Sequence, residues 1–374
     1  MQPVPTRFKR LVHLLRTEGD TPARQSAAVG IGVFIGCLPL YGLHLPLCLA
    51  ACRVGRLNRI KMYLAANISN PAFAPLLLFI SVQLGVLVRT GHPYRLSLAA
   101  LSEAGPWRFA QDLFVGSVML GTVLGLVGAA IAWAIARTPE PTDALFEAAA
   151  DLYLPASITA WEFARNKLKA DPAYGWIVMS LALPREGRLL DIGCGQGLLL
   201  AALATARGWA HEQRWPPHWP TPPRYDLTGI EVRPRAAALA RHALGSRATI
   251  VDGDGRDVAF DSADVIVLMD VLHLLSEPAQ EALLARAVKA LGPGGVLLVR
   301  EADSGAGWRF RAVQIGNRIT ALVRGNWRQR FAFRSEKEWR ALLAKLDVAV
   351  GRVPLPDGPV FGNVLLIARR ARPQ

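Results

Sequence analysis

Three long apolar stretches dominate the first third of the chain. They run from about Ala27 to Ala51, from Met62 to Val88 and from Leu113 to Ala136. Each has enough residues to cross the roughly 30 Å of hydrocarbon in a bilayer as a helix. Three such runs in close succession do not suit the buried helices of a soluble protein. The pattern therefore predicts an α-helical membrane domain over residues 1–137.

Helix-breaking residues interrupt the first stretch. Gly36, Pro39, Gly42 and Pro46 fall in its middle, and such breaks suit a re-entrant hairpin whose freed backbone groups are shielded by protein. Two prolines in the segment SNPAFAP interrupt the second stretch as well. The flanking basic residues are Arg7, Lys9, Arg10, Arg16 and Arg24 before the first stretch and Arg53, Arg56, Arg59 and Lys61 after it. Since basic loops favour the cytoplasm, we expect the hairpin to return to its starting face, the next two stretches to cross out and back, and the rest of the chain to be cytoplasmic.

Beyond the polar segment RTPEPTD (137–143) the pattern becomes that of an α/β domain. Helical patterns cover roughly 143–168 and 171–183, and we assign residues 138–184 to a linker and helical lid. From 185 to 374 strand and helix patterns alternate, which is typical of a doubly wound, mostly parallel sheet. The predicted strands are 189–192, 227–231, 248–251, 265–269, 296–300, 347–353 and 362–369, and the predicted helices are 196–207, 234–244, 278–291 and 335–346. The last two strands, joined by the turn LPDGP, should form an antiparallel hairpin at the sheet edge.

Composition adds a partner to this picture. The chain is 52% hydrophobic, yet it carries 43 Lys and Arg against 29 Asp and Glu, a net charge of +14. An apolar and basic chain favours contact with an anionic membrane surface. Nucleic-acid binding would instead need basic residues beside exposed aromatics in a polar domain. The cysteines, Cys37, Cys48, Cys52 and Cys194, form no CxxC pair and have no zinc-site spacing, so neither a disulfide nor a metal site is expected.

The sequence LLDIGCGQGLLL, from Leu189 to Leu200, points to the chemistry. It predicts a strand, a glycine turn of the form GxGxG and a helix, with Asp191 two residues before the first glycine. Dinucleotide-binding turns have the spacing GxGxxG, and a carboxylate at this place suits an ammonium group better than a pyrophosphate. Carboxylates also follow the next two strands. Glu231 can accept both hydroxyls of a ribose, and Asp254 can accept from the amino group of an adenine, while a backbone N–H at Gly255 meets a ring nitrogen.

These residues, with DVIVLMDVLHLL from Asp264 and LGPGGVLLV from Leu291, resemble class I S-adenosylmethionine-dependent methyltransferases over residues 185–368. The resemblance implies a Rossmann-like, seven-stranded α/β fold and S-adenosyl-L-methionine as the cofactor. The cofactor-binding residues that it implies are Asp191, Gly193, Cys194, Gly195, Gly197, Glu231, Val232, Asp254, Gly255 and Asp270. A nicotinamide enzyme, or a fold that binds no cofactor, is the alternative.

Methyl transfer needs an acceptor held in line with the methyl group and, for a hydroxyl, amine or activated carbon, a general base. His273, after the fourth predicted strand, is the candidate base, although the same side chain could simply hydrogen-bond a loop. Glu301, a second catalytic candidate, and Asp303 follow the fifth strand on the acceptor side. Neither an NPPY motif nor a catalytic cysteine signature accompanies them, which argues against nucleic-acid methylation.

Two segments have no fixed place in such a domain. The insertion HEQRWPPHWPTPPRYD (211–226) could be a substrate lid, a membrane contact through Trp215 and Trp219, or a neutral loop. The segment after Asp303 is aromatic and basic. It contains Trp308, Arg309, Arg324, Arg328, Arg330 and Arg334. Four roles are open for this segment: it could line an acceptor pocket, bind an acidic carrier, lie against anionic lipid, or form a solvated face.

Two narrower resemblances bear on function. The runs GIGVFIGCLPLYG and ISNPAFAP, within Thr21 to Gly91, are similar to a small bacterial inner-membrane family of unknown function. The runs FARNKLKADPAY, DIGCGQGLL, AGWRF and FGNVLLIAR resemble methyltransferases of aryl-polyene (xanthomonadin-type) pigment pathways. Together they imply methyl transfer to a lipophilic or carrier-bound aromatic or polyene acceptor at the inner membrane, with membrane lipid as a partner and no nucleic acid. Methylation of a quinone or lipid, or a membrane transport or assembly module with a regulatory S-adenosylmethionine-binding domain, are the alternatives.

Overall fold

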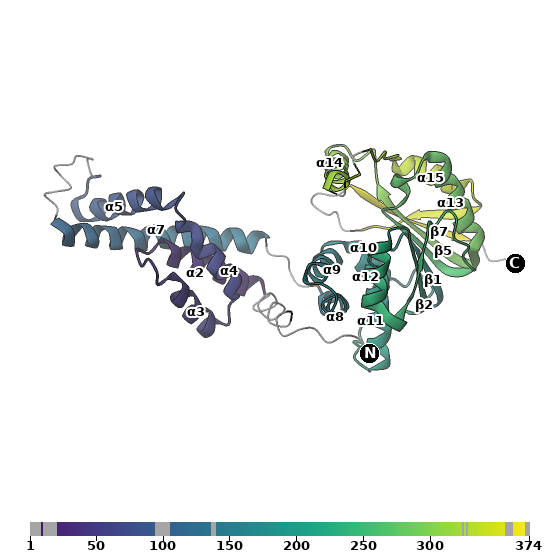
Figure 1. Cartoon of the computed structure of the whole chain (residues 1–374), viewed down its shortest axis with the longest axis horizontal. Helices are drawn as coiled ribbons and strands as arrows, with labels where there is room; N and C mark the ends of the chain where they lie inside the picture. Colours follow the sequence, from purple (N-terminus) through teal and green to yellow (C-terminus); the bar gives the residue numbers. More distant parts are fainter. Residues whose placement is uncertain are drawn as a thin grey trace. The chain divides into compact units, whose positions relative to one another are not determined.

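The computed structural model describes residue 9 and residues 21–93, 105–135, 140–323, 325–326, 328–355 and 362–370. These residues belong to two compact units, one within Thr6–Glu140 and the other continuing from Pro141. In Figure 1 the first unit is purple to blue and the second runs from teal to yellow. The basic residues Arg7, Arg10 and Arg16 and the start of the segment RTPEPTD lie outside the described residues.

The first unit is entirely helical in its described part. Its helices are α2 (Pro22–Cys37), α3 (His44–Gly55), α4 (Arg59–Ala66), the short η1 (Asn67–Ser69), α5 (Ala74–Thr90) and α7 (Gly105–Ile135). The chain leaves the helical conformation between α2 and α3, at the Pro39 and Gly42 that the sequence marks as a break. Proline supplies no N–H for a helical hydrogen bond, so a helix cannot continue through it undisturbed.

The second apolar stretch is interrupted at the segment SNPAFAP, as its prolines indicate. The pair Arg59–Ser69 and Ala74–Thr90 is bent by 74° at the segment that holds Pro71. Among the described helices, α7 alone is long and apolar enough to cross a bilayer by itself, and the bent pair passes the same test only if its two parts count as one span.

Small residues let the helices of this unit approach closely. Helix α7 packs against α2 and α5, and α4 packs against α2. A Cβ atom added at Gly116 of α7 would lie 1.7 Å from the Ser81 carbonyl oxygen of α5, so only glycine fits there. Beside this contact, Nε and Nη2 of Arg89 lie 2.8 and 2.7 Å from the two carboxylate oxygens of the buried Asp112. The close backbone contact and the bidentate Arg89–Asp112 ion pair therefore both hold α5 against α7.

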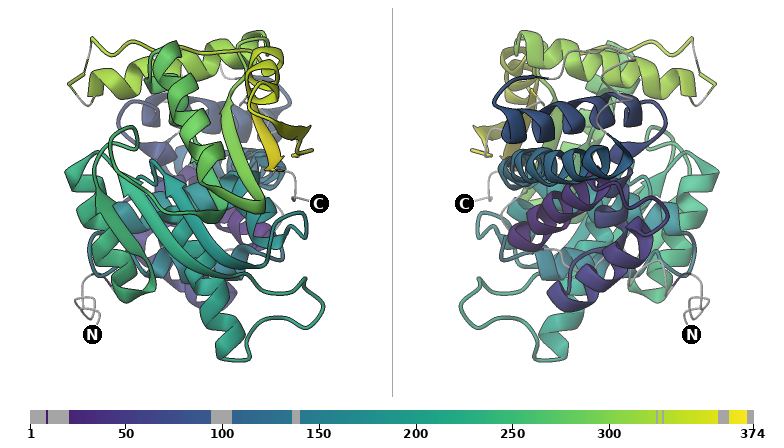
Figure 2. Two further views of the ribbon diagram at one scale, coloured as in Figure 1. Left: turned by 90° about the vertical axis from the view of Figure 1, so that its right-hand side faces the viewer. Right: turned by 90° about the vertical axis from the view of Figure 1, so that its left-hand side faces the viewer.

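The second unit contains a seven-stranded sheet covered on both faces by helices (Figure 2). Its strands are β1 (Glu186–Ile192), β2 (Arg224–Glu231), β3 (Thr249–Asp252), β4 (Ala263–Met269), β5 (Leu291–Ala302), β6 (Val348–Arg352) and β7 (Asn363–Arg370). They are ordered β3-β2-β1-β4-β5-β7-β6. The first five are parallel, and β7 runs antiparallel to both β5 and β6. The predicted Rossmann-like sheet and its terminal antiparallel pair are confirmed, while most of the turn LPDGP lies outside the described residues.

Two apolar cores lie on the two faces of the sheet. One core is formed with α8 (Asp143–Asp151), α9 (Ile158–Ala170), α10 (Pro172–Met179), α11 (Leu198–His211) and α12 (Pro234–Leu244). The other is formed with α13 (Glu277–Ala290) and α15 (Glu336–Ala344). The helices before the sheet thus belong to the same compact unit as the sheet. The predicted helix at 143–168 is in fact two helices, because the chain turns at Leu152–Ser157, where Pro155 lies.

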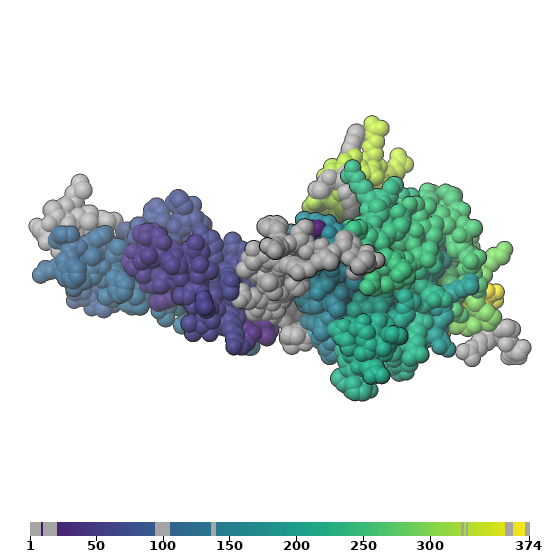
Figure 3. Space-filling view, turned by 60° about the horizontal axis from the view of Figure 1, so that its bottom comes forward, coloured from purple at the N-terminus to yellow at the C-terminus, as the bar shows by residue number. Residues whose placement is uncertain are grey.

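Two further features differ from the sequence pattern. The insertion between α11 and β2 folds back on itself. Its Trp215 and Trp219 rings meet edge to face, 4.9 Å apart, and both pack against the first core. This packing leaves both rings only partly exposed. A helix absent from the prediction, α14 (Trp308–Val323), follows β5, and the yellow-green atoms of this region project from the surface in Figure 3.

Candidate cofactor and acceptor site

The glycine turn follows Asp191 at the carboxyl end of β1. The N–H groups of Gly193 and Cys194 donate to the Ile230 carbonyl, at 2.7 and 3.0 Å, so the turn passes over the end of β2. Gly193 has φ +79°, and a Cβ there would lie 2.4 Å from Cγ2 of Val271. Gly195 has φ +60°, but a Cβ there would meet only Nη2 of Arg233, at 3.5 Å. One side of the turn is thus packed, and the side at Gly195 is open to a ligand.

Asp191 is buried without a cation of its own. Burial raises its pKa to about 7, and the nearby Glu231 adds to the effect. In the described part of the chain no group donates a hydrogen bond to its carboxylate. A buried carboxylate is stabilised by a positive charge brought next to it. This position therefore favours a cationic ligand group.

Each of the two other predicted anchors is held by an arginine two residues later. Glu231 is buried, and its oxygens accept from the N–H groups of Gly195 (2.7 Å) and Arg233 (2.9 Å) and from Nε of Arg233 (2.7 Å). Asp254 accepts from the backbone N–H of Arg256 at 2.9 Å and from its guanidinium at 3.0 and 2.6 Å. The hydrogen bonds from Arg256 hold the pKa of Asp254 below its usual range. A ligand that uses these carboxylates has to share them with the arginines or displace them.

The remaining predicted contacts lie along the same edge of the sheet. Val232 follows Glu231 and is 58% exposed. A Cβ at Gly255 would lie 2.5 Å from Cγ2 of Ile192, so the backbone there closes against the end of β1. Cys194 is partly buried, and its thiol pKa is raised by burial and by the charges of Asp191 and Glu231. The thiol therefore stays protonated and is not a nucleophile.

A buried ion-pair network supports Asp270, and the sequence does not predict it. Arg300 of β5 is buried, and its guanidinium contacts Asp270 at 2.5 Å and Asp171 at 2.9 Å. Asp171 also pairs with Lys167 at 2.9 Å and caps the start of α10 through the N–H of Ala173. The sequence does carry a signal for the position of Asp171, because an Asp-Pro pair is typical of the beginning of a helix. The network joins α10 to the ends of β4 and β5, next to the glycine turn.

His273 and Glu301 form a buried pair at the acceptor side. Nδ1 of His273 lies 2.7 Å from Oε2 of Glu301, whose other oxygen accepts from the N–H groups of Val271 and Leu272. Burial opposes the charged imidazole, but the hydrogen bond and charge of Glu301, with Asp270 and Asn317, raise the pKa of His273 overall. The structure brings the two predicted catalytic residues together, and Glu301 fixes the orientation of the ring.

Aromatic rings cover this pair. Phe333 stacks on His273 with ring centres 5.1 Å apart and planes 7° apart, and Phe331 stacks at 6.0 Å. Phe310 of α14 meets Phe333 edge to face at 5.1 Å. The Ala332 N–H also donates to the His273 carbonyl. In this arrangement His273 holds the segment before α15 in place, and it reaches an acceptor only if Phe333 moves.

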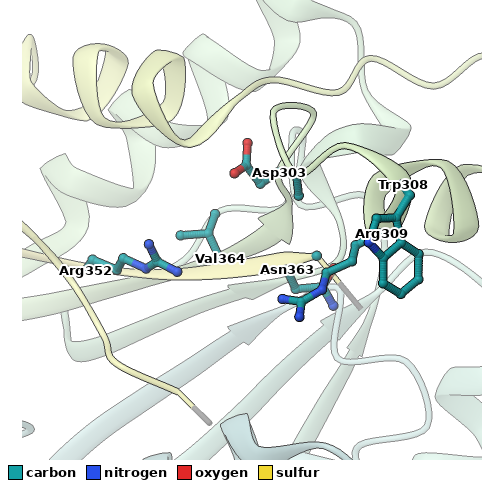
Figure 4. A pocket seen from close by; sticks show the side chains of 8 residues that line it. Asp303, Trp308, Arg309, Arg352, Asn363 and Val364 are labelled. Carbon is teal, nitrogen blue, oxygen red and sulfur yellow. The ribbon is translucent and has the colours of Figure 1, made fainter. Parts of the chain in front are cut away.

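Asp303 lines a hollow of about 330 Å³ at the same edge of the sheet (Figure 4). The other lining residues include Trp308, Arg309, Arg352 and Asn363. Asn363 pairs with Ala302, so the hollow lies where β5 ends and β7 begins. One oxygen of Asp303 accepts from the N–H groups of Gly305 and Glu336, which gives this carboxylate a role in the loop and at the start of α15.

Comparison with known proteins agrees with this geometry. The family model described as "Methyltransferase domain" matches residues 139–350. The chain belongs to this methyltransferase family. A second model, described as an uncharacterized protein conserved in bacteria, matches residues 6–140. The boundary between the two matches falls at the boundary between the two compact units.

Individual relatives resemble only the methyltransferase part. A carboxy-S-adenosyl-L-methionine synthase of Chromohalobacter salexigens is 36% identical over 141 residues, which are 35% of this chain and 47% of that protein. A 2,7-dihydroxy-5-methyl-1-naphthoate 7-O-methyltransferase of Streptomyces carzinostaticus is 35% identical over 125 residues, 32% of each chain. This chain thus spans about half or less of the length of these curated relatives. The magnesium protoporphyrin IX methyltransferase of Synechocystis PCC 6803 with bound S-adenosylhomocysteine has 14% identity and a TM-score of 0.39, over 58% of this chain and 89% of that one.

S-adenosylmethionine is the cofactor of this domain, as the sequence predicts, and the residues present fit it. Asp191 suits the cationic end, and Glu231 and Asp254 offer acceptors for hydroxyl and amino groups. Oε1 of Gln196, in the turn itself, is a buried polar atom to which no described group donates a hydrogen bond. Buried polar atoms are rarely left without a partner, so this oxygen is suited to a ligand donor. The assignment of the individual contacts remains a prediction.

Proposed function

We propose that the chain transfers a methyl group from S-adenosylmethionine to a lipophilic acceptor of aromatic or polyene type at the cytoplasmic face of a bacterial inner membrane. One observation carries the proposal. The buried Asp191 beside an open glycine turn shares a chain with α7, which is apolar and long enough to cross a bilayer. Bound S-adenosylmethionine supplies a methyl group on a positively charged sulfur.

One group of residues at the sheet edge would bind the cofactor, and a second group would activate the acceptor. Asp191 attracts the cationic end of the cofactor, while Glu231 and Asp254 orient its ribose and adenine. At the other end, Glu301 holds the imidazole of His273 in one orientation. When Phe333 moves aside, His273 removes the proton from an acceptor hydroxyl and water stays excluded by the aromatic rings. Positioning supplies the greater part of the rate, because methyl transfer is an in-line displacement.

Three features support a lipophilic, aromatic acceptor. The acceptor side is lined by Phe310, Phe331 and Phe333, whose rings suit another aromatic group. The name of the Streptomyces relative describes methylation of a hydroxyl on a naphthoate. The chain also contains α7, which is long and apolar enough to cross a bilayer and would bring a lipophilic acceptor within reach. A quinone or a lipid headgroup would use the same site and the same chemistry.

A regulatory function is the second candidate, and one observation favours it. Glu231 and Asp254 are each tied to an arginine that cofactor binding would release. Such a release could report the cofactor concentration to the helical unit without any methyl transfer. The arginines would then change position on binding while no acceptor gained a methyl group.

The decisive experiment follows labelled methyl from S-adenosylmethionine in membranes that contain the full chain. We expect label in the organic extract with the wild type, little with Asp191→Asn, and wild-type label with Asp226→Asn, which changes an exposed carboxylate on β2. Equal label with and without Asp191 would exclude the proposed reaction. Label that stays on a modified, water-soluble cofactor would instead indicate chemistry like that in the name of the Chromohalobacter relative.

A further inference from the structure

The segment between β5 and α15 is unusually basic. From Ser304 to Ser335 the sequence has seven arginines and no aspartate or glutamate, so this segment supplies half of the net charge of +14. One of the seven, Arg334, is balanced by Glu277 and Glu281 of α13. Arg324 lies outside the described residues. The rest of this charge is concentrated around α14.

Helix α14 exposes an apolar stripe to solvent. Trp308, Ile315, Ile319 and Leu322 are 64%, 59%, 55% and 61% exposed. Their spacing of seven, four and three residues places them on one side of an α-helix. Among the described helices and strands, none packs extensively against α14. The helix lies along the outer edge of the unit in both views of Figure 2, and no described helix or strand covers the stripe.

Arginines border the stripe. Arg311 and Arg318 are exposed. Arg311 lies one turn before Ile315, and Arg318 lies between Ile315 and Leu322, so both arginines follow one edge of the stripe. In the described part of the chain neither forms an ion pair, although Arg318 donates to the Gln329 carbonyl at 3.2 Å and lies over the Phe331 ring. An apolar stripe with a cationic edge complements the interface of an anionic bilayer, which offers hydrocarbon below and negative headgroups above.

We infer that α14 is an interfacial helix that lays its stripe on an anionic lipid surface. Trp308, Ile315, Ile319 and Leu322 enter the boundary between headgroups and acyl chains, and Arg311 and Arg318 contact the headgroups. The methyltransferase domain therefore has a membrane contact of its own, separate from the helices of residues 6–140.

The opposite side of α14 leads to the candidate acceptor site. Phe310 contacts Phe333, and Phe333 covers His273. An acceptor dissolved in the bilayer would reach His273 along these rings without crossing water. This consequence rests on the proposed methyl transfer, whereas the contact of α14 with lipid does not.

Hydrogen exchange of the full chain tests the inference. The chain is placed in nanodiscs of phosphatidylcholine alone, or of phosphatidylcholine with phosphatidylglycerol, and exchange is measured for amides 308–323. We expect exchange about tenfold slower with the anionic lipid. The double variant Ile315→Asp/Ile319→Asp should lose this protection, and Arg311→Gln/Arg318→Gln should lose the difference between the two lipids. Leu181→Asp, at a residue 70% exposed outside α14, is the matched control and should behave as the wild type. Unchanged exchange in α11 shows that each variant is folded.

The other occupants of the stripe give different results. Protection that is already complete in nanodiscs of phosphatidylcholine alone would mean that the chain itself covers α14, and protection that rises with protein concentration would mean a second copy. Either result overturns the inference, as does equal exchange in the two kinds of nanodisc. Lipid protection without methyl transfer would leave the docking surface intact and remove the proposed function. Methyl transfer with an unprotected α14 would support the proposed function and remove the docking surface.

Discussion

Nδ1 of His273 lies 2.7 Å from Oε2 of Glu301, and both side chains are buried. The second oxygen of Glu301 accepts from two backbone N–H groups that follow β4. The carboxylate thus joins β5 to the segment after β4 and holds the imidazole from one side, while Phe333 covers its face. A histidine held in this way contributes to the stability of the site.

Replacing Glu301 by Gln should destabilise the site in a pH-dependent manner. The raised pKa of His273 stabilises the fold fully below its ordinary pKa, and this stabilisation is lost as the pH rises through the raised value. We expect Glu301→Gln to lower the free energy of opening of β5 amides by about 1–3 kcal/mol at pH 6 and by less at pH 9. Hydrogen exchange at the two pH values measures this. Glu186→Gln, on the exposed start of β1, is the control, and an equal loss at both pH values would contradict the assignment.

Asp191→Asn should separate cofactor binding from stability. Burial raises the pKa of this carboxyl to about 7, so its ionisation destabilises the folded domain increasingly between about pH 4 and pH 7. The asparagine removes that cost, and we expect a gain in thermal midpoint that grows over this range. Affinity for S-adenosylmethionine should fall about 10- to 100-fold, because a charge-assisted contact is lost.

Calorimetry gives an independent check on Asp191. A cation beside the carboxylate favours its ionised form, so binding to the wild type at pH 6 should release a proton. The binding enthalpy will then depend on the ionisation enthalpy of the buffer in the wild type and much less in Asp191→Asn. No buffer dependence in the wild type would show that Asp191 does not meet the cation.

Arg233→Ala should release Glu231 to the cofactor. Two contacts from the Arg233 side chain disappear, and a buried carboxylate with fewer donors is less stable. We expect a lower thermal midpoint without ligand and about tenfold tighter binding of S-adenosylhomocysteine by calorimetry. Arg235→Ala, on the exposed surface of α12, should change neither. Weaker binding by Arg233→Ala would mean that the arginine presents Glu231 to the ribose.

Two glycines of α7 should respond in opposite ways to alanine. At Gly116 a Cβ would lie 1.7 Å from a carbonyl oxygen of α5, whereas at Gly128 its nearest neighbours are 3.5 and 3.6 Å away. We expect Gly116→Ala to destabilise the helical unit by about 1–3 kcal/mol. Gly128→Ala should be neutral or stabilising by up to about 1 kcal/mol, because alanine favours a helix. Thermal unfolding in detergent compares the two, and equal midpoints would contradict the close α5–α7 contact.

The sheet could be predicted from the sequence because its signals are local. The strand before the glycine turn, the alternation of elements and the carboxylates at strand ends all follow from neighbouring residues. They place Asp191, Glu231 and Asp254 at one edge, where the structure has them. The double break of the second apolar stretch was visible as prolines, but the bend of 74° depends on how α5 packs against α7.

The contacts that distinguish the site could not be predicted from local sequence patterns, because they join residues far apart in the chain. Phe333 covers His273 from a position sixty residues further along the chain, and Arg300 meets Asp171 across an even longer separation. Whether Glu231 faces a ribose or Arg233 depends on side-chain orientation rather than spacing. Helix α14 escaped prediction because its apolar stripe faces solvent, and an apolar stripe usually indicates the side that faces the core.

The pairing of β5 with β7 has a consequence for synthesis on the ribosome. Ala302 lies opposite Asn363, so the wall of the acceptor side is completed by a strand made long after β1, β2 and β3. Domains form as the chain emerges, and any ligand that binds a folded part stabilises it. The strands that lead to Asp191, Glu231 and Asp254 are therefore synthesised before the strand that completes the proposed acceptor side, and we expect cofactor supply in the cell to influence how much of the protein matures.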